Sequence, residues 1–369
     1  MIYLDNAATS FPKPKSVIRE VTECLTKYCG NPGRSSHKLA LAAADKIFET
    51  RVIISDFLGW KKCENVVFLP SATYALNIVI KGLITHKCHC IISDLEHNST
   101  IRPLTKVLND HGGEYSIFDT NLPLKDAIEP LIRKDTEIII STLCSNVTGK
   151  IVDFNQLSEI AQSHNLKLII DASQYVGHKE LDLSDLYFSA LCAAGHKGLF
   201  GIQGSAFTII NDPELFDTLI EGGSGVDTFS PTMPTLLPER YEAGTLSTPA
   251  IASLAAGISF LNKVGIGEVE TKLTQLTDIL KNELMNIPTV TSYGAECGII
   301  SFNVGNYTSS YVADILDGKG IATRSGFHCA PIIHKKLGTA DRGAVRVSLS
   351  YFNTEPQLYS LCKTIRSIN

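Results

Sequence analysis

Short apolar runs alternate along the chain with longer amphipathic stretches. Apolar runs bounded by turn-forming residues are typical of buried strands. They occur at 66–69, 89–93, 115–118, 137–143, 166–170, 187–193 and 205–210. Stretches with helical periodicity occur at 38–58, from about 74, at 99–110, at 154–164 and at 249–264. Because strands and helices alternate, the pattern predicts βαβ units and an α/β fold with a mainly parallel sheet.

The two ends of the chain show different patterns. Pro12 and Pro14 stand at alternate positions and exclude a helix or a central strand there, so residues 1–15 are expected to form an N-terminal arm. Residues 16–262 are expected to form the large domain. The remaining residues, 263–369, are expected to form a smaller α+β domain. Its predicted elements are helices at 268–285, 309–317 and 355–366 and strands near 289–293, 299–304 and 321–324.

One lysine and one aspartate stand at the ends of two predicted strands. Lys197 follows the run at 187–193 in a glycine-rich bend, and Asp171 follows the run at 166–170. A lysine at the edge of an apolar segment either extends its amine to water or is used chemically, and for a single lysine the first is the more common case. Two such residues at the carboxyl ends of parallel strands can face one crevice, which favours the second.

Composition narrows the functional classes. The chain has 369 residues, 44% hydrophobic and 19% charged, with a net charge of −5, which indicates a well-packed globular protein and gives no reason to expect nucleic acid or membrane as partner. No signal peptide or long apolar run stands out, so a cytoplasmic location is expected.

The ten cysteines lack the spacing of an extracellular framework, so most are expected to be reduced and buried. His86, Cys88, His89 and Cys90 could imitate a zinc site, but alternate residues of a strand face opposite ways, so no metal is expected.

With Gln174 after Asp171 and His196 before Lys197, the pattern resembles the aminotransferase class V family. The resemblance covers almost the whole chain. It implies that the N-terminal arm, residues 1–15, runs along the active-site mouth. It implies a fold type I enzyme that depends on pyridoxal 5′-phosphate (PLP), with a seven-stranded, mainly parallel sheet in the large domain. It also implies that Lys197 holds the cofactor as a Schiff base and that Asp171 pairs with its pyridinium nitrogen.

Other site residues are carried over from the same resemblance. The turn at Ala72 and Thr73 would bind the phosphate at a helix N-terminus, although many α/β proteins have this geometry only for capping. His97, otherwise an ordinary loop residue, would stack on the ring. Asn146, otherwise a turn former, would face the cofactor and the substrate carboxylate. Thr245 would reach the phosphate in the other subunit of a homodimer with shared active sites, and Arg34 would lie near the partner's site or simply at a polar helix start.

The segment from Arg324 to Pro331 carries the most discriminating chemistry. Cys329 lies in a loop bounded by Gly326 and Pro331, beside His328 and close to Arg324, a setting that favours a reactive thiolate. The pattern Arg-x-Gly-x-His-Cys-Ala is similar to that of cysteine desulfurases with a short catalytic loop and of selenocysteine lyases. Alternatively, Cys329 is an incidental loop thiol. Arg346 occupies the family's place for the arginine that binds the substrate carboxylate.

The resemblance implies conversion of L-cysteine to L-alanine, with the sulfur passing to Cys329 as a persulfide, His97 as proton courier and an acceptor protein as a further partner. Glu221-Gly222-Gly223-Ser224-Gly225 indicates a less characterised branch, and Ala194 replaces a phosphate-binding Ser or Thr. A selenocysteine lyase, or a related β-elimination on another sulfur amino acid, is the second interpretation. A PLP-fold binding or sulfur-relay protein with poor turnover is the third.

Overall fold

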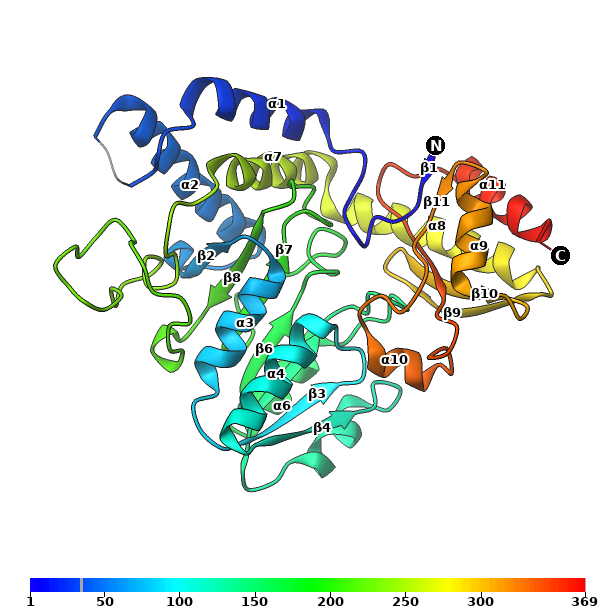
Figure 1. Ribbon diagram of the computed structural model, residues 1–369, viewed down its shortest axis with the longest axis horizontal. Helices are drawn as coiled ribbons and strands as arrows, with labels where there is room; N and C mark the ends of the chain where they lie inside the picture. The colour runs from blue at the N-terminus through cyan, green and yellow to red at the C-terminus, as the bar shows by residue number, and fades with distance from the viewer. Residues whose placement is uncertain (34–35, 369) are drawn as a thin grey trace.

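A seven-stranded sheet forms the centre of the computed structural model, which describes residues 1–33 and 36–368 (Figure 1). The strand order is β2-β8-β7-β6-β5-β3-β4. β8 runs antiparallel to both of its neighbours, and the other neighbouring pairs are parallel. The predicted seven-stranded, mainly parallel sheet is therefore confirmed. Its strands are β2 (Val66–Leu69), β3 (His89–Ser93), β4 (Glu114–Phe118), β5 (Thr136–Thr142), β6 (Lys167–Asp171), β7 (Ala190–Ala194) and β8 (Ala206–Ile210).

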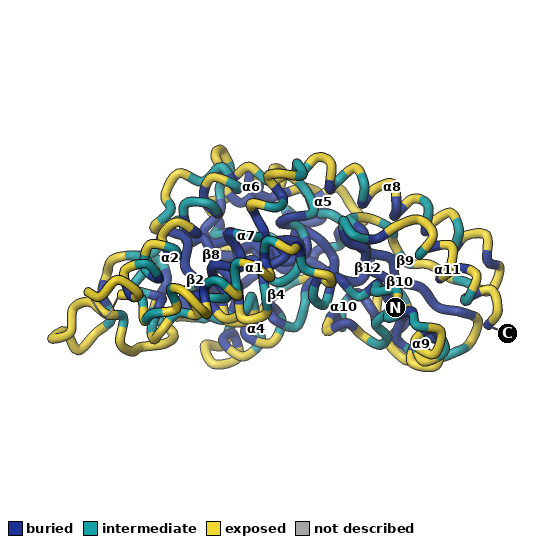
Figure 2. Tube along the Cα trace, turned by 90° about the horizontal axis from the view of Figure 1, so that it is seen from above, coloured by how far each residue is buried: buried dark blue, intermediate teal, exposed yellow. Residues whose placement is uncertain are grey.

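Apart from the edge strand β4, the strands are mostly buried because helices cover both faces of the sheet. Successive side chains of a strand point to opposite faces, so Ile91 and Ile139 belong to one hydrophobic cluster while Ile92 and Ile140 belong to the other. Figure 2 shows the buried chain in the middle of the molecule, with the helices presenting their exposed sides outward. Apolar residues on consecutive strand positions are therefore required here.

The helices divide between the two faces. α3 (Ala72–Leu83) and α4 (Asn98–His111) pack in the cluster on one face. α2 (Lys38–Phe57), α6 (Phe154–Ser163) and α7 (Thr248–Val264) pack in the cluster on the other. Shorter elements complete this part of the chain: α1 (Lys15–Glu23), η1 (Cys24–Tyr28), η2 (Cys63–Asn65), α5 (Leu124–Ile128), η3 (Glu129–Leu131) and η4 (Pro213–Leu215).

A small three-stranded sheet follows in the C-terminal part of the chain. Its order is β12-β10-β9, with antiparallel pairs. The first residues of the chain join this part, because β1 (Ile2–Tyr3) pairs in parallel with β11 (Ile321–Ala322). The remaining elements are α8 (Ile266–Met285), β9 (Val290–Glu296), β10 (Ile299–Val304), α9 (Ser309–Asp317), α10 (Pro331–Lys336), β12 (Val345–Ser348) and α11 (Glu355–Arg366).

Within the described ranges, no single helix is long and apolar enough to cross a membrane. α7 and α8 together reach the required length and composition, but they meet at an 80° bend. Most residues of α7 are buried in the core of the protein.

Candidate active site

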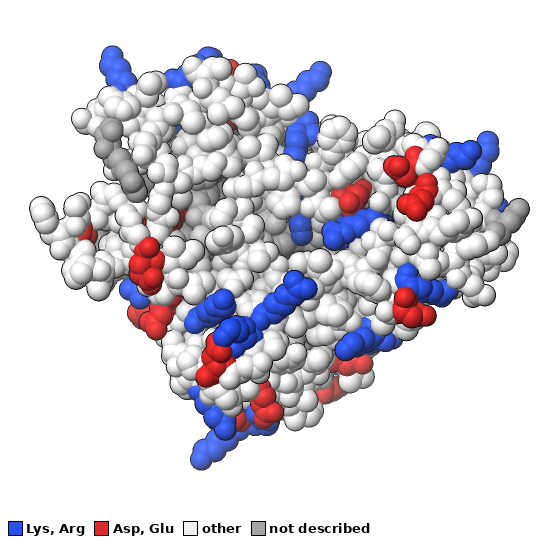
Figure 3. All heavy atoms as spheres, viewed as in Figure 1, with Lys and Arg blue, Asp and Glu red and all other residues white. Residues whose placement is uncertain are grey.

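A cavity lies at the carboxyl ends of β3, β5, β6 and β7, where parallel α/β sheets commonly bind their ligands. It also reaches the N-terminus of α3. Figure 3 shows lysine and arginine side chains around the hollow at the centre of this face. This one cavity is lined by eight of the predicted site residues: Ala72, Thr73, His97, Asn146, Asp171, Gln174, His196 and Lys197.

Lys197 lies in the glycine-rich bend after β7. A side chain at Gly195 would place its Cβ 2.3 Å from a methyl group of Leu254, so the tight bend requires glycine there. Burial lowers the pKa of Lys197 to about 8; the Asp171 carboxylate opposes this shift, and Arg346 and Arg324 add to it. About a tenth of the amine is therefore neutral and nucleophilic at pH 7, far more than for an ordinary lysine.

Asp171 is the last residue of β6 and is buried. Its Oδ1 accepts a hydrogen bond from the Ser173 backbone N–H at 2.9 Å. A carboxylate held in this way at the floor of a cavity can pair with a protonated nitrogen of a ligand.

His97 caps the N-terminus of α4. Its Nδ1 accepts a hydrogen bond from the Ser99 backbone N–H at 3.0 Å, and the Ser99 hydroxyl lies 2.9 Å from Thr73 Oγ1. Burial, with a smaller contribution from the Lys197 charge, lowers the pKa of His97 to about 4. The ring is therefore neutral at physiological pH and carries its proton on Nε2.

The cavity wall offers polar groups that no protein group satisfies. Among the described buried side chains, Gln174 Oε1, Ser173 Oγ and His196 Nδ1 have no hydrogen-bond partner. The first turn of α3, capped by the Ser71 hydroxyl, adds backbone N–H groups and the positive end of a helix dipole. An anionic ligand with several polar atoms fits such a wall better than an apolar one does.

The N-terminal arm closes one side of the site. The backbone carbonyl of His196, directly before Lys197, accepts hydrogen bonds from the Ser10 N–H at 3.1 Å, from Lys13 Nζ at 2.9 Å and from the Thr9 and Ser10 hydroxyls at 3.2 Å. Gln174 Nε2 donates to the Ala7 carbonyl at 2.9 Å. Sequence reasoning placed the arm at the active-site mouth but did not identify these contacts, because no local pattern signals them.

Arg346 joins the arm to the cavity wall. The guanidinium is 1% exposed; its Nη2 lies 2.7 Å from Asp5 Oδ1, and its Nη1 donates to the Asn146 carbonyl at 3.0 Å. Its Nε has no hydrogen-bond partner among the residues that the structure describes. Arg346 thus lies behind Asn146 with part of its fork already engaged by Asp5, and binding of a substrate carboxylate remains a prediction.

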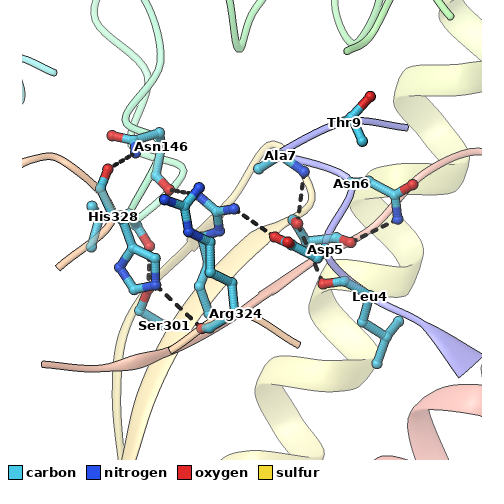
Figure 4. A network of polar contacts seen from close by, with 12 residues as sticks. Leu4, Asp5, Asn6, Ala7, Thr9, Asn146, Ser301, Arg324 and His328 are labelled. Carbon is cyan, nitrogen blue, oxygen red and sulfur yellow. Dashed lines mark hydrogen bonds and ion pairs between the residues drawn. The ribbon is translucent and has the colours of Figure 1, made fainter. Parts of the chain in front are cut away.

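The Cys329 loop is held against the cavity from the C-terminal side. Asn146 Nδ2 donates to the His328 carbonyl, and the Asn98 N–H donates to the Cys329 carbonyl, both at 2.7 Å (Figure 4 draws the first). Cys329 is exposed and adopts a left-handed backbone with φ 55°. The backbone around the thiol is therefore bonded to the cavity residue Asn146 and to Asn98, the neighbour of the cavity residue His97.

The sequence analysis expected both His328 and Arg324 to make the surroundings of Cys329 favourable for a thiolate, and the structure differs for His328. His328 is 2% exposed, and burial lowers its pKa to about 3, so its ring is neutral at physiological pH. Arg324 supplies positive charge instead, since its charge lowers the pKa values of both Lys197 and His97. Lys336 of α10 pairs with Asp94 and Asp119 and ties the end of the loop segment to the corner after β3.

Four predicted site residues that the structure describes do not line this cavity: Cys329, Arg324, Arg346 and Thr245. Thr245 lines a separate cavity together with Tyr74 and Glu242, and its predicted role across a dimer remains a prediction. Arg34 lies outside the described residues. Cys144, which the sequence analysis did not select, does line the Lys197 cavity.

The histidines and cysteines near β3 are used locally. His86 pairs with Glu137 at 2.8 Å, and the buried His89 lies within hydrogen-bond distance of the Thr136 and Ser116 hydroxyls. Within the described part of the chain, no group of three or more His, Cys, Asp or Glu side chains is arranged to hold a metal ion.

The model of the aminotransferase class-V family matches residues 2–361. The chain belongs to this family. It is 30% identical to a probable cysteine desulfurase of Methanothermobacter thermautotrophicus, over 100% of this chain and 94% of the relative. It is 31% identical to a probable cysteine desulfurase of Pyrococcus abyssi, over 100% and 96%. An apo structure of a cysteine desulfurase from Thermococcus onnurineus NA1 superposes with a TM-score of 0.93 at 31% identity, covering 99% of this chain and 94% of that one.

Class-V aminotransferases are PLP-dependent, and the cavity fits that cofactor. The unpartnered Gln174 and His196 atoms, the carboxylate of Asp171, the amine of Lys197 and the N-terminus of α3 are the groups that a ring with a phosphate, a hydroxyl and an aldehyde needs. The predicted family and fold are therefore confirmed.

Proposed function

We propose that this protein is a PLP-dependent cysteine desulfurase that converts L-cysteine to L-alanine and transfers the sulfur to Cys329. The observation that carries the proposal is the attachment of the exposed Cys329 loop, through Asn146 and Asn98, to the rim of the cavity that holds Lys197. An enzyme that only moves amino groups has no use for a thiol in that place.

Lys197, Asp171 and the first turn of α3 would hold the cofactor, with Ala72 and Thr73 at its phosphate and His97 against its ring. Bound there, the cofactor supplies an electron sink for a carbanion at the substrate Cα. Asp171 would keep the pyridinium nitrogen of the bound cofactor protonated. His196 and Gln174, whose buried atoms lack protein partners, complete the polar wall.

Lys197 is the group proposed to move the α-proton. Its pKa of about 8 makes it basic enough to accept a proton from the substrate and acidic enough to return it. Arg346, through Nε, and Asn146 would orient the substrate carboxylate, with Arg324 as a second cation nearby. His97, which carries its proton on Nε2, would deliver a proton on the ring side of the site.

Cys329 would act as the nucleophile toward the substrate sulfur. A new S–S bond forms while the substrate Cβ–S bond breaks, and the released electron pair remains with the three-carbon fragment, which takes up a proton to become alanine. The sum is cysteine plus a Cys329 thiol giving alanine plus a Cys329 persulfide. A second protein or a thiol would then accept this sulfur, and we propose a homodimer in which Thr245, and Arg34 by its place in the sequence, serve the partner's site.

The test compares two substitutions with matched controls. Purified protein with added PLP should absorb at about 420 nm. It should release alanine from cysteine, and in the presence of a reductant it should also release sulfide. Lys197→Ala should lose both the band and the products, whereas Lys335→Ala, at an exposed lysine of α10, should keep them. Cys329→Ala should keep the band and lose sulfide release, whereas Cys29→Ala, at another exposed cysteine, should not.

Two results would contradict the proposal. Sulfide release unchanged in Cys329→Ala would exclude Cys329 as the sulfur acceptor, and a protein that stays colourless with PLP would favour the binding or relay interpretation. Assay of cysteine, selenocysteine and cystine side by side tests the second enzymatic interpretation. Selenide release that survives Cys329→Ala while sulfide release does not would favour a selenocysteine lyase, because selenium leaves with less nucleophilic help.

A further inference from the structure

Two cysteines far apart in the sequence meet beside the active-site cavity. Cys144 follows β5 and lines the cavity that contains Lys197. Cys297 occupies the two-residue turn between β9 and β10 and packs against a small cluster of Ala7, Cys144 and Ile299. The pair therefore connects the seven-stranded sheet to the C-terminal sheet.

The backbone segments that carry the two cysteines are in close contact. A Cβ on Gly149 would lie 1.8 Å from the Glu296 carbonyl oxygen, and one on Gly294 would lie 2.4 Å from the Thr148 carbonyl oxygen. The Ile151 N–H donates to Glu296 Oε2 at 3.2 Å, and the Ser301 hydroxyl donates to the Val147 carbonyl at 2.6 Å. The hairpin is thus docked on both sides of the turn that presents Cys297.

The two thiols differ in access. Cys144 is buried, and its S–H donates to the Gly149 carbonyl at 3.4 Å. Interaction with the Cys297 thiol, followed by burial, raises the pKa of Cys144 well above its usual value. Cys297 is partly exposed, and its Sγ lies 3.8 Å from the Gln174 carbonyl. A reagent from solution therefore meets Cys297 first and finds Cys144 protonated behind it.

We propose that Cys144 and Cys297 form a redox-sensitive thiol pair that a peroxide converts into a disulfide. The Cys297 sulfur attacks one oxygen of the peroxide, the O–O bond breaks, and a sulfenic acid and water form. The Cys144 sulfur then attacks the Cys297 sulfur, so that the S–S bond forms, the S–O bond breaks and a second water leaves. In sum, two thiols and one hydrogen peroxide give one disulfide and two waters.

The link would act on the active site through the chain next to Cys144. Asn146 is two residues away and holds the carbonyl of His328, the neighbour of Cys329. A covalent tie at Cys144 would fix this wall of the cavity to the hairpin and prevent the two from separating. The chemistry of the pair does not depend on the proposed reaction, so it can be tested without an activity assay.

The experiment uses full-length Cys329→Ala protein, so that the exposed loop thiol does not react. After treatment with hydrogen peroxide and blocking of free thiols, peptide mapping without reduction should find the Cys144 peptide joined to the Cys297 peptide, and dithiothreitol should separate them. In the linked protein, amide hydrogen exchange in the β9–β10 hairpin should slow about tenfold.

Cys297→Ser should abolish the link and leave Cys144 as a thiol, while the matched variant Cys63→Ser, at another partly exposed cysteine, should keep it. Oxidation of Cys297 to sulfenic or sulfinic acid with Cys144 still free would overturn the proposal. So would a joined peptide pair confined to other cysteines, such as Cys24 and Cys29. Mapping of the Cys329→Ala protein alone decides between these results even if Cys297→Ser fails to fold.

Discussion

Burial shifts the pKa values of the ionisable side chains in the site so that their neutral forms are favoured. It lowers the pKa of Lys197 to about 8, that of His97 to about 4 and that of His328 to about 3. Glu96, fully buried beside His97, has its pKa raised to about 8 by the same cause. All four shifts favour the neutral form, which is the physical effect of removing a charge from water. The site therefore combines a reactive amine with neutral imidazoles.

The shift of Lys197 predicts how stability depends on pH. Its pKa is about 8 in the folded, cofactor-free protein and about 10.5 when unperturbed, so between these values the unfolded chain binds more protons. Stability contributed by Lys197 therefore increases as pH rises from 8 to 10.5. The thermal midpoint of wild type minus that of Lys197→Met should therefore increase as pH rises over this range. Lys335→Met should show no such change, and parallel curves for wild type and Lys197→Met would contradict the shift.

Individual elements bring the reacting groups together by ending at the same edge of the sheet. β6 ends at Asp171 and β7 ends at Ala194, three residues before Lys197. α4 begins immediately after His97, whose side chain caps it. The end of each strand and the start of the helix thus place one functional side chain each.

Close packing of the β9–β10 hairpin predicts unequal effects of two glycine substitutions. Gly149 has φ +73° and an added Cβ would meet the Glu296 carbonyl, whereas Gly112 has φ +72° and nothing within 4 Å. Gly112→Ala should lower the free energy of unfolding by about 1 kcal/mol, the cost of a left-handed alanine. Gly149→Ala should lower it by about 3 kcal/mol or more, because the hairpin must move. Urea unfolding of both variants measures this, and equal losses would show that the contact is not tight.

At the scale of the whole molecule, the first residues of the chain hold its two sheets together. β1 pairs with β11, Asp5 with Arg346, and Lys13 with the carbonyl before Lys197. The molecule also exposes large apolar side chains, including Leu39, Leu41 and Phe48 of α2 and Phe229 of the segment before α7. An exposed apolar surface of this kind is expected where a second copy binds.

A homodimer with shared sites predicts complementation between two defective subunits. Thr245→Ala should weaken PLP binding, and Lys197→Ala should abolish turnover. If Thr245 serves the partner's site, a mixed dimer of the two variants contains one site with both residues intact, so co-expression should restore activity to about half of the wild-type value per mixed dimer. Sedimentation of wild type should show the dimer. Failure of separately tagged, co-purified mixed dimers to regain activity would place Thr245 in its own subunit's site.

The residues that sequence reasoning located best are those whose role depends on local pattern. The predicted strand at 66–69 and the predicted final helix at 355–366 agree with β2 and α11, because periodicity and turn residues act over a few positions. α1 and α10 were not predicted, since they span only nine and six residues and so show few turns of helical periodicity. Lys197 and Asp171 could be paired in advance because parallel strands end at a common edge.

The alternation of strands and helices, the mainly parallel sheet and the positions of Lys197 and Asp171 at its carboxyl edge followed from the sequence alone, because local periodicity and the geometry of βαβ units are sufficient for these. The other site residues at this edge came from the family resemblance. The tertiary structure decided that Asp5 engages Arg346, that the arm donates to the His196 carbonyl, that His328 is buried and neutral, and that Cys144 meets Cys297. Such contacts join residues distant in the chain, and they form only where the path of the folded backbone brings them together.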